Sequence, residues 1–163
     1  MVMRRALKHL FMPHWLAVRP FPKSVLRKIE RAVKDSERSH RGEIRFAVEG
    51  PLHLLHLRIS ARERSKQVFG QLGVWDTAEN SGVLIYVQLV DRKIEIVADR
   101  GIAARVKQHE WDAVCRAMER SFKQGQFEQG ALEAIRQVTA ILAQHFPSKG
   151  DHPNELPDKP AVL

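Results

Sequence analysis

Cysteine and long apolar runs are both scarce in this chain of 163 residues. Its one cysteine, Cys115, excludes an internal disulfide and any metal site built from several cysteines. No stretch approaches the roughly 18 apolar residues of a membrane-spanning helix. The glycine patterns of a P-loop, a dinucleotide fingerprint and a nucleophile elbow are missing, and so is the H-E-x-x-H zinc pattern. The enzyme classes that these motifs mark are therefore not indicated.

Charge, by contrast, is abundant and unevenly placed. The net charge is +8, and residues 1–34 hold nine of the 27 basic residues but only one of the 19 acidic residues. The remaining chain is neutral, so this is a neutral domain with a basic front end. Such a segment favours an anionic membrane surface or a protein partner. Nucleic acid is not expected, because Phe11, Trp15 and Phe21 are the only aromatic residues among the basic ones.

The first 21 residues are predicted to form an amphipathic arm. A signal peptide is not expected, because Lys8 and Pro13 interrupt any apolar core and no small-residue cleavage site follows. Apolar residues, including Phe11 and Trp15, instead recur at helical spacing. Two roles remain open for the arm, namely an interfacial helix on a membrane and a segment that packs onto its own domain. We expect a cytoplasmic protein, peripheral to the inner membrane face if the arm binds lipid.

A β-hairpin is predicted near the middle of the chain. Two β-rich runs, Val83–Val90 and Ile94–Ala98, flank the polar turn Asp91-Arg92-Lys93. The first run is almost wholly apolar, as in a strand covered on both faces, and the second alternates. A hairpin brings its open ends together, so the loop before the first strand should lie beside the loop after the second.

The order of predicted elements indicates an α/β fold, a three-layer α/β/α sandwich around a small mixed sheet. Helices are expected on both sides of a strand at 43–49 and after the hairpin, within a domain spanning residues 22–146. If the strand at 43–49 runs parallel to the strand at 83–90, the helix that a Ser60–Glu63 capping box begins is the crossover between them. Residues 147–163 contain four prolines and no periodicity, which predicts a disordered tail.

Carboxylates and an amide would then gather where the hairpin opens. The expected set is Glu43, Asp76, Glu79, Asn80, Asp99 and Arg100. Such oxygens are ligands that Ca²⁺ or Mg²⁺ takes, although no spacing here matches a calcium loop. The alternative is that Asp76 and Asp99 cap turns and that Arg100 pairs with an acid.

The same residues carry a resemblance to a known family. The segments Gln71-Leu-Gly-Val-Trp-Asp76 and Asn80-Ser-Gly-Val-Leu-Ile85, the turn Asp91-Arg92 and the closing Arg100-Gly-Ile102 resemble the TPM domain. The resemblance covers about residues 24–146 and is distributed over the chain rather than confined to one catalytic motif.

The resemblance implies an open α/β/α sandwich. It also implies phosphatase activity and divalent-cation binding, which are attributed to some members, and membrane-linked or photosystem-repair roles. Carried over to this sequence, the metal candidates are Asp76, Asn80 and Asp99. From its expected place at the same end of the sheet, Glu43 is a weaker metal candidate, and Arg100 is the candidate that holds the phosphate. The chain departs from many members by having Asp-Arg-Gly at 99–101 and by lacking an export signal and a transmembrane segment.

Three functions follow as hypotheses. The first is a TPM-like binding or accessory module at a membrane, with a weak divalent-cation site. The second is a metal-dependent phosphatase acting on phosphate monoesters. The third is a protein-docking adaptor that uses Phe11 and Trp15.

Overall fold

A mixed sheet of four strands organises the chain, in the order β3-β2-β1-β4. The computed structural model describes residues 2–163, with side chains from residue 3 onward. Its elements are α1 (Val2–Phe11), α2 (His14–Ala17), α3 (Lys23–Ser36), β1 (Glu43–Glu49), η1 (Leu54–His56), α4 (Ala61–Gln71), β2 (Gly82–Gln88), β3 (Lys93–Ala98), α5 (Arg100–Ala103), α6 (Gln108–Lys123), α7 (Phe127–His145) and β4 (Ala161–Val162).

Strand β1 runs parallel to β2 and pairs Glu43 with Gly82, which settles the direction that the sequence left open. The connection between them carries α4, which begins at the predicted capping box. Strand β3 returns antiparallel to β2 and pairs Ala98 with Val83. The beginning of β1, the beginning of β2 and the end of β3 therefore meet at one end of the sheet, as expected.

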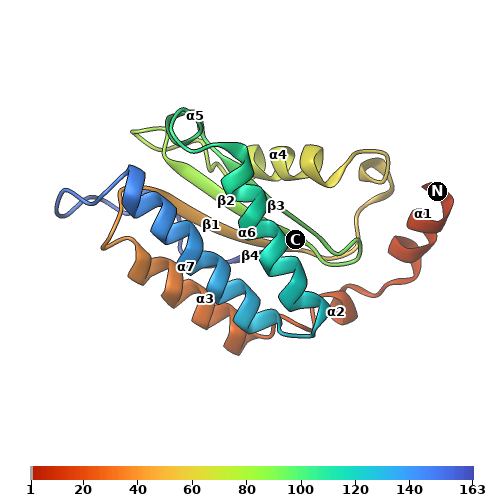
Figure 1. Ribbon diagram of the computed structural model, residues 1–163. Helices are drawn as coiled ribbons and strands as arrows, with labels where there is room; N and C mark the ends of the chain where they lie inside the picture. Colours follow the sequence, from red (N-terminus) through yellow and green to blue (C-terminus); the bar gives the residue numbers. More distant parts are fainter. Residues whose placement is uncertain (1) are drawn as a thin grey trace.

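Helices cover both faces of the sheet, which confirms the predicted α/β/α sandwich (Figure 1). Alternate residues of β1, such as Ile44 and Phe46, face a core that α3, α6 and α7 complete. The opposite face carries Ala47 of β1 and Leu84 of β2, which pack against Val68 of α4. Because one face meets three helices and the other only one, the second face needs additional cover.

The hairpin forms with a longer turn than predicted. Strand β2 ends at Gln88 rather than at Val90, and Gln88 pairs with Lys93. The Gln88 side chain accepts a hydrogen bond of 2.9 Å from the Asp91 amide, and Arg92 adopts a φ of 55°. A side chain thus stabilises the turn in place of two further strand pairs.

The prediction of a disordered C-terminal tail is wrong. Residues 147–163, here called the C-terminal strap, cross the second face beside β1 and end in β4, which pairs parallel to β1. Leu156 is buried there with Val68 and Leu84. Proline is compatible with an extended edge segment, and the strap's few apolar residues reach a core that earlier parts of the chain have built.

The N-terminal arm, residues 2–21, lies beyond the hairpin turn at the right of Figure 1. Helix α1 ends at Phe11, just before Pro13, as the proline predicts. Among the described residues, no helix combines the length and the apolar character needed to cross a membrane.

Candidate functional site

The open end of the hairpin contains a buried carboxylate, that of Asp99. It follows β3 and caps α5, where its Oδ1 accepts a hydrogen bond of 2.7 Å from the Arg100 amide. Its side chain is buried, and within residues 3–163 its Oδ2 has no hydrogen-bond partner. A buried carboxylate oxygen without a partner is uncommon in folded proteins, so Asp99 retains one unused ligand atom.

The loop before β2 lies directly beside Asp99, as the hairpin predicted. The Gly101 amide donates to the Asn80 carbonyl over 3.0 Å, and the Asp99 amide donates to the Gly82 carbonyl over 2.8 Å. The two backbones approach so closely at Gly101 that a Cβ there would lie 2.4 Å from the Glu79 carbonyl oxygen. Glycine is required at that position because any side chain would separate the loops.

The other predicted site residues have different surroundings. Asp76 and Arg100 are exposed, and the Glu79 carboxylate forms an ion pair with Arg41. Glu43 lies beneath the strap, where its Oε2 accepts a hydrogen bond of 3.2 Å from the Leu156 amide. Within the described chain, no group of three or more His, Cys, Asp or Glu side chains is placed to hold a metal ion.

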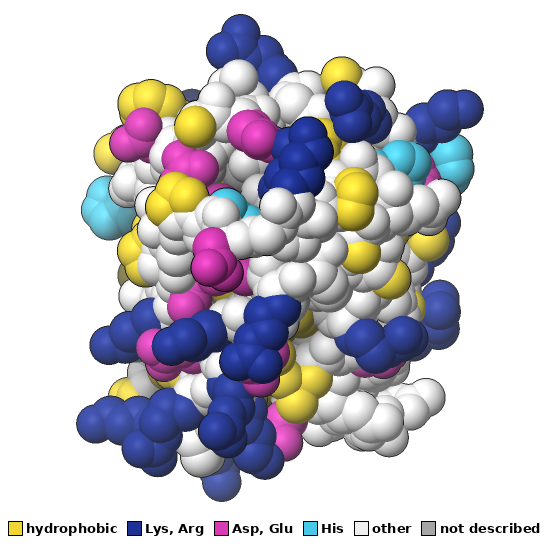
Figure 2. All heavy atoms as spheres, turned by 90° about the vertical axis from the view of Figure 1, so that its left-hand side faces the viewer, with side chains coloured by type: hydrophobic (Ala, Val, Ile, Leu, Met, Phe, Trp, Pro, Cys, Tyr) yellow, Lys and Arg dark blue, Asp and Glu magenta, His cyan; other side chains and the backbone are white. Residues whose placement is uncertain are grey.

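The surface at this end carries mixed charge (Figure 2). Acidic and basic side chains are interspersed over its upper half, while Lys and Arg gather lower down, at the level of α3. The exposed basic residues of α3 are Lys23, Arg27, Lys28, Arg31 and Lys34. The surface charge at the open end of the hairpin therefore does not strongly favour either a cation or an anion.

A second group of buried polar residues, which the sequence did not reveal, lies under the C-terminal strap. Arg45 donates through Nη1 to the carbonyls of Pro157 and Lys159 over 2.5 and 2.6 Å. His152 binds through Nε2 to the carbonyls of Glu37 and His40 over 3.2 and 2.9 Å. These contacts join residues more than 100 positions apart, so no local pattern signals them.

Burial shifts the pKa values of this group. Burial and then the neighbouring Asp158 carboxyl raise the pKa of Glu37 to about 8. Burial likewise raises the pKa of Glu43 and lowers the pKa of His40 to about 4. Glu37 therefore retains its proton at neutral pH, and His40 is neutral there.

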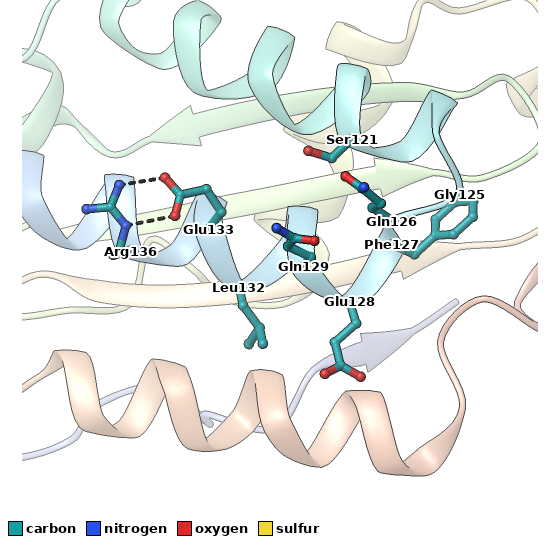
Figure 3. A pocket seen from close by; sticks show the side chains of 9 residues that line it. All are labelled: Ser121, Gly125, Gln126, Phe127, Glu128, Gln129, Leu132, Glu133 and Arg136. Atoms are coloured by element: carbon teal, nitrogen blue, oxygen red, sulfur yellow. Dashed lines mark hydrogen bonds and ion pairs between the residues drawn. The ribbon is translucent and has the colours of Figure 1, made fainter.

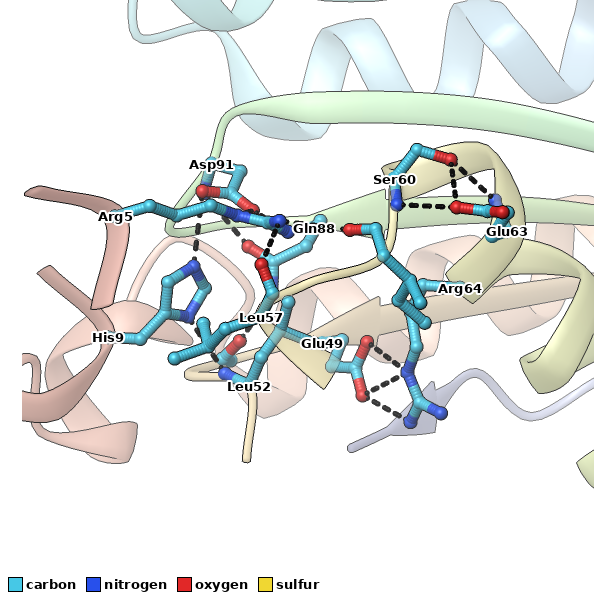
Figure 4. Close-up of polar contacts among 12 residues, drawn as sticks. Arg5, His9, Glu49, Leu52, Leu57, Ser60, Glu63, Arg64, Gln88 and Asp91 are labelled. Atoms are coloured by element: carbon cyan, nitrogen blue, oxygen red, sulfur yellow. Dashed lines mark hydrogen bonds and ion pairs between the residues drawn. The ribbon is translucent and has the colours of Figure 1, made fainter. Parts of the chain in front are cut away.

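The N-terminal arm is fastened to the hairpin turn through its polar side (Figure 4). Arg5 donates through Nε to Asp91 Oδ2 over 2.9 Å and through Nη1 to the Leu57 and Ile59 carbonyls. His9 places Nε2 3.1 Å from Asp91 Oδ1, and its Nδ1 accepts from the Leu52 amide over 2.8 Å. Burial opposes ionisation of Asp91, but the hydrogen bonds from Arg5 and His9 outweigh it and lower the pKa of the carboxyl.

The apolar side of the arm faces outward. Phe11 is 75% exposed and Trp15 is 69% exposed. The arm also exposes Met3, Leu7, Leu10 and Leu16, and η1 exposes Leu54 and Leu55. Because Arg5 and His9 lie four positions apart on one helical face, the opposite face of α1 is left without a partner. We call the six exposed apolar side chains between residues 3 and 16 the apolar face of the arm.

Two cavities accompany these features. One, of about 850 Å³, lies between the arm and the hairpin, with Met12, Leu16 and Phe122 in its lining and Lys8, Arg92 and Lys123 among its charged residues. The other, of about 680 Å³, lies where α6 meets α7 (Figure 3), but its Arg136 is paired with Glu133. Only the first cavity adjoins an apolar face.

Comparisons with known proteins show which family the domain resembles. The chain matches the model of one protein family, described as the TPM domain, over residues 21–141. It is similar to the BA42 protein of the psychrophilic bacterium Bizionia argentinensis, whose NMR structure matches with a TM-score of 0.77 and 33% identity over 87% of this chain and 94% of that one. None of the curated proteins compared with the chain matches it.

A more distant solved structure shares the fold alone. The N-terminal domain of a protein from P. gingivalis matches with a TM-score of 0.64 and 13% identity, over 88% of this chain and 97% of that domain.

Proposed function

The chain belongs to the TPM domain family, and we propose that it is a binding module whose N-terminal arm docks on an anionic membrane surface. One observation carries this proposal: α1 is fastened to the domain through Arg5 and His9, which leaves its apolar side facing outward. A helix that only completes a core has the reverse orientation. An anchored helix with an exposed apolar side presents a surface that a partner covers.

The chemistry of the arm favours lipid as that partner. Phe11, Trp15 and the exposed leucines are suited to the boundary between headgroups and acyl chains. Arg4 and Lys8, also exposed on α1, would lie at the level of anionic headgroups. Each such basic side chain contributes about 1 kcal/mol near an anionic surface. The exposed basic residues of α3 extend the positive charge beyond the arm.

Vesicle sedimentation tests the proposal. The full chain should sediment with vesicles that contain phosphatidylglycerol and less with vesicles of phosphatidylcholine alone. Replacing Phe11 and Trp15 together by serine should weaken partitioning by more than about tenfold, because two large apolar groups no longer enter the lipid. Trp75→Ser is the matched control, since Trp75 is 57% exposed but belongs to the loop before β2.

Equal sedimentation of the wild type and the double variant would overturn the membrane assignment. Deletion of residues 1–18 supplies a second check, because it removes the apolar face of the arm together with Arg4 and Lys8. If the wild type ignores vesicles but retains a protein in pull-downs that the double variant loses, the arm acts as a protein-docking adaptor instead.

A divalent-cation site at the open end of the hairpin is the second candidate function. The buried Asp99 Oδ2, which has no partner within residues 3–163, favours it. Asp99 would hold Ca²⁺ or Mg²⁺ there, with Asp76 and Asn80 from the adjoining loop. Glu43 is left out of this set, because its Oε2 is bonded to the Leu156 amide. A site with so few protein ligands is expected to bind weakly.

A bound cation would supply the charge that polarises a phosphoryl oxygen, which is the chemistry a phosphatase needs. Arg100, exposed at the start of α5, would hold the phosphate. We expect saturable NMR shifts confined to residues 76–82 and 99–102 when metal-stripped protein is titrated with Ca²⁺ or Mg²⁺. An unchanged spectrum at millimolar metal would remove the site. Equal phosphate release from an aryl phosphate by wild type and Asp76→Asn would remove the phosphatase function.

A further inference from the structure

The outer edge of β1 is completed by a segment from outside the domain that the family comparison matches. That match ends at residue 141, whereas the strap begins at residue 147. The strap pairs Ala161 with Ala47 and Val162 with Val48. Hydrogen bonds of 2.9 Å run from the Leu163 amide to the Val48 carbonyl and from the Gly50 amide to the Leu163 carbonyl. Without the strap, β1 would be an open edge strand.

The domain holds the strap chiefly by its backbone. Arg45 binds two of its carbonyls, Glu43 binds the Leu156 amide, and β1 binds its last residues. Among the strap's side chains, Leu156 and Pro160 are buried against the domain. His152 and Glu155 bind backbone groups of the domain. Main-chain hydrogen bonds combined with pockets for a few side chains are how domains recognise extended peptides by strand addition.

The surface beneath the strap also retains polar capacity that the strap does not use. Within residues 3–163, seven buried side-chain atoms have no hydrogen-bond partner, and five belong to residues at the strap, namely Glu37, His40, Glu43 and Arg45. A segment that is simply part of a fold normally satisfies the polar groups that it buries. Unpaired polar atoms under the strap reduce what its burial contributes to stability, which favours its exchange for another segment.

We propose that the β1 edge is a binding site for an extended peptide, and that the C-terminal strap is its replaceable occupant. The peptide that fits is a segment of the strap's own kind, Leu156-Pro-Asp-Lys-Pro-Ala-Val-Leu163, supplied by a second copy of the chain. Its prolines favour the extended backbone and carry no amide hydrogen. The carbonyls of Pro157 and Lys159 are left to face Arg45. If two copies exchanged straps, each strap would make the same contacts with the other copy's β1, so the two chains would be joined without an additional interface.

A nicked chain tests this directly. A recognition site for a specific protease is inserted between Lys149 and Gly150, where both residues are exposed. The full chain is folded first and then cut, so that folding does not depend on the truncated domain. A fluorescent peptide with the sequence of residues 151–163 is added, and its anisotropy is followed. We expect saturable binding, competition by unlabelled peptide and none by a scrambled peptide of the same composition.

Two modified peptides identify the contacts. N-methylation at Leu163 removes the hydrogen bond to the Val48 carbonyl and should weaken binding about tenfold. Replacing Lys159 by alanine removes only an exposed side chain, because Arg45 binds the carbonyl of that residue. This control peptide should bind as the unmodified peptide does.

Each contrary result overturns the proposal. If the labelled peptide fails to enter while the nicked chain keeps its dispersed NMR spectrum, the strap is not replaceable. If the strap leaves and the spectrum collapses, the strap belongs to the core of the fold. If both modified peptides bind as tightly as the unmodified one, the β1 edge is not the site.

Discussion

The two ends of the chain are attached to the same domain by opposite means. The N-terminal arm is held mainly by side chains, with Asp91 binding both Arg5 and His9. The C-terminal strap is held along its length by backbone groups, through Arg45 and the pairing of β4 with β1. Helix α1 leaves Leu10 and Phe11 in solvent, whereas the strap buries Leu156.

This difference separates a segment that extends the fold from one that presents a surface. Burial of apolar area is the main favourable contribution to folding, so the strap adds to the stability of the domain. Helix α1 contributes mostly polar contacts, and its exposed side chains such as Leu10 add little to the stability of the isolated chain. The apolar face of the arm is therefore the surface that the proposed membrane docking would cover.

Two leucine substitutions should show the largest difference in stability between the two ends. Leu156 is 6% exposed and Leu10 is 65% exposed. Leu156→Ala should lower the free energy of unfolding by about 3 kcal/mol, since it removes buried methyl groups and leaves a cavity. Leu10→Ala should change it by less than about 0.5 kcal/mol. Urea unfolding measures both, and equal losses would contradict the assignment of the two ends.

Replacement of Arg45, which binds two carbonyls of the strap, should have the next largest effect on stability. Arg45→Met should lower the free energy of unfolding by about 2 kcal/mol, because the carbonyls of Pro157 and Lys159 lose their charged donor. Arg4→Met, at an exposed position of α1, is the matched control and should be nearly neutral. Amide exchange at Gly50, which donates to the Leu163 carbonyl, should accelerate only in the Arg45 variant.

Release of the arm should be a smaller effect. Asp91→Asn removes the charge that Arg5 and His9 share and should cost about 1 kcal/mol, discounted because the pair is partly exposed to water. The Leu52 amide, which donates to His9, should then lose protection from exchange while the Gly50 amide does not. Asp35→Asn, at an exposed position of α3, is the control. Unchanged protection of Leu52 would mean that Asp91 does not hold the arm.

A pH dependence of opposite sign is expected at the two ends. The pKa of Glu37 is about 8 in the folded chain against 4.5 for a free carboxyl. The stability it contributes to the strap is therefore complete below pH 4.5 and is lost as the pH rises through 8. The pKa of Asp91 is lowered, so its contribution is complete above the ordinary value of 3.8 and is lost as the pH falls through the lowered pKa.

NMR shifts of two amides follow this titration. Between pH 6.5 and 8.5 the Gly50 signal should move towards that of an open strap, and Glu37→Gln should abolish the movement. At acid pH the arm is followed by the Leu52 signal, because the Leu52 amide donates to His9. The Gly50 signal is not suited to acid pH, because His40, with a pKa of about 4, is protonated there next to the strap. A Gly50 signal that stays fixed up to pH 8.5 would show that Glu37 does not stabilise the strap.

Much of the domain follows from local pattern. The alternation of Ile94 and Ile96, the capping box at Ser60 and the break at Pro13 act over a few residues, and the structure contains what they predict. The meeting of Asn80 and Asp99 was also predictable, because a hairpin necessarily brings its open ends together. Only the exact end of β2 differs, since the Gln88 side chain bonds the turn.

How the two ends of the chain attach to the domain depends on the tertiary structure alone. The sequence of α1 showed an apolar side and a polar side, but the position of Asp91 decided which of them faces the domain. Likewise, residues 147–163 have too little apolar content to order themselves, yet β1 and Arg45 offer them partners more than 100 residues away. Local sequence determines which conformations a segment favours. What the segment binds depends on surfaces that exist only once the rest of the chain has folded.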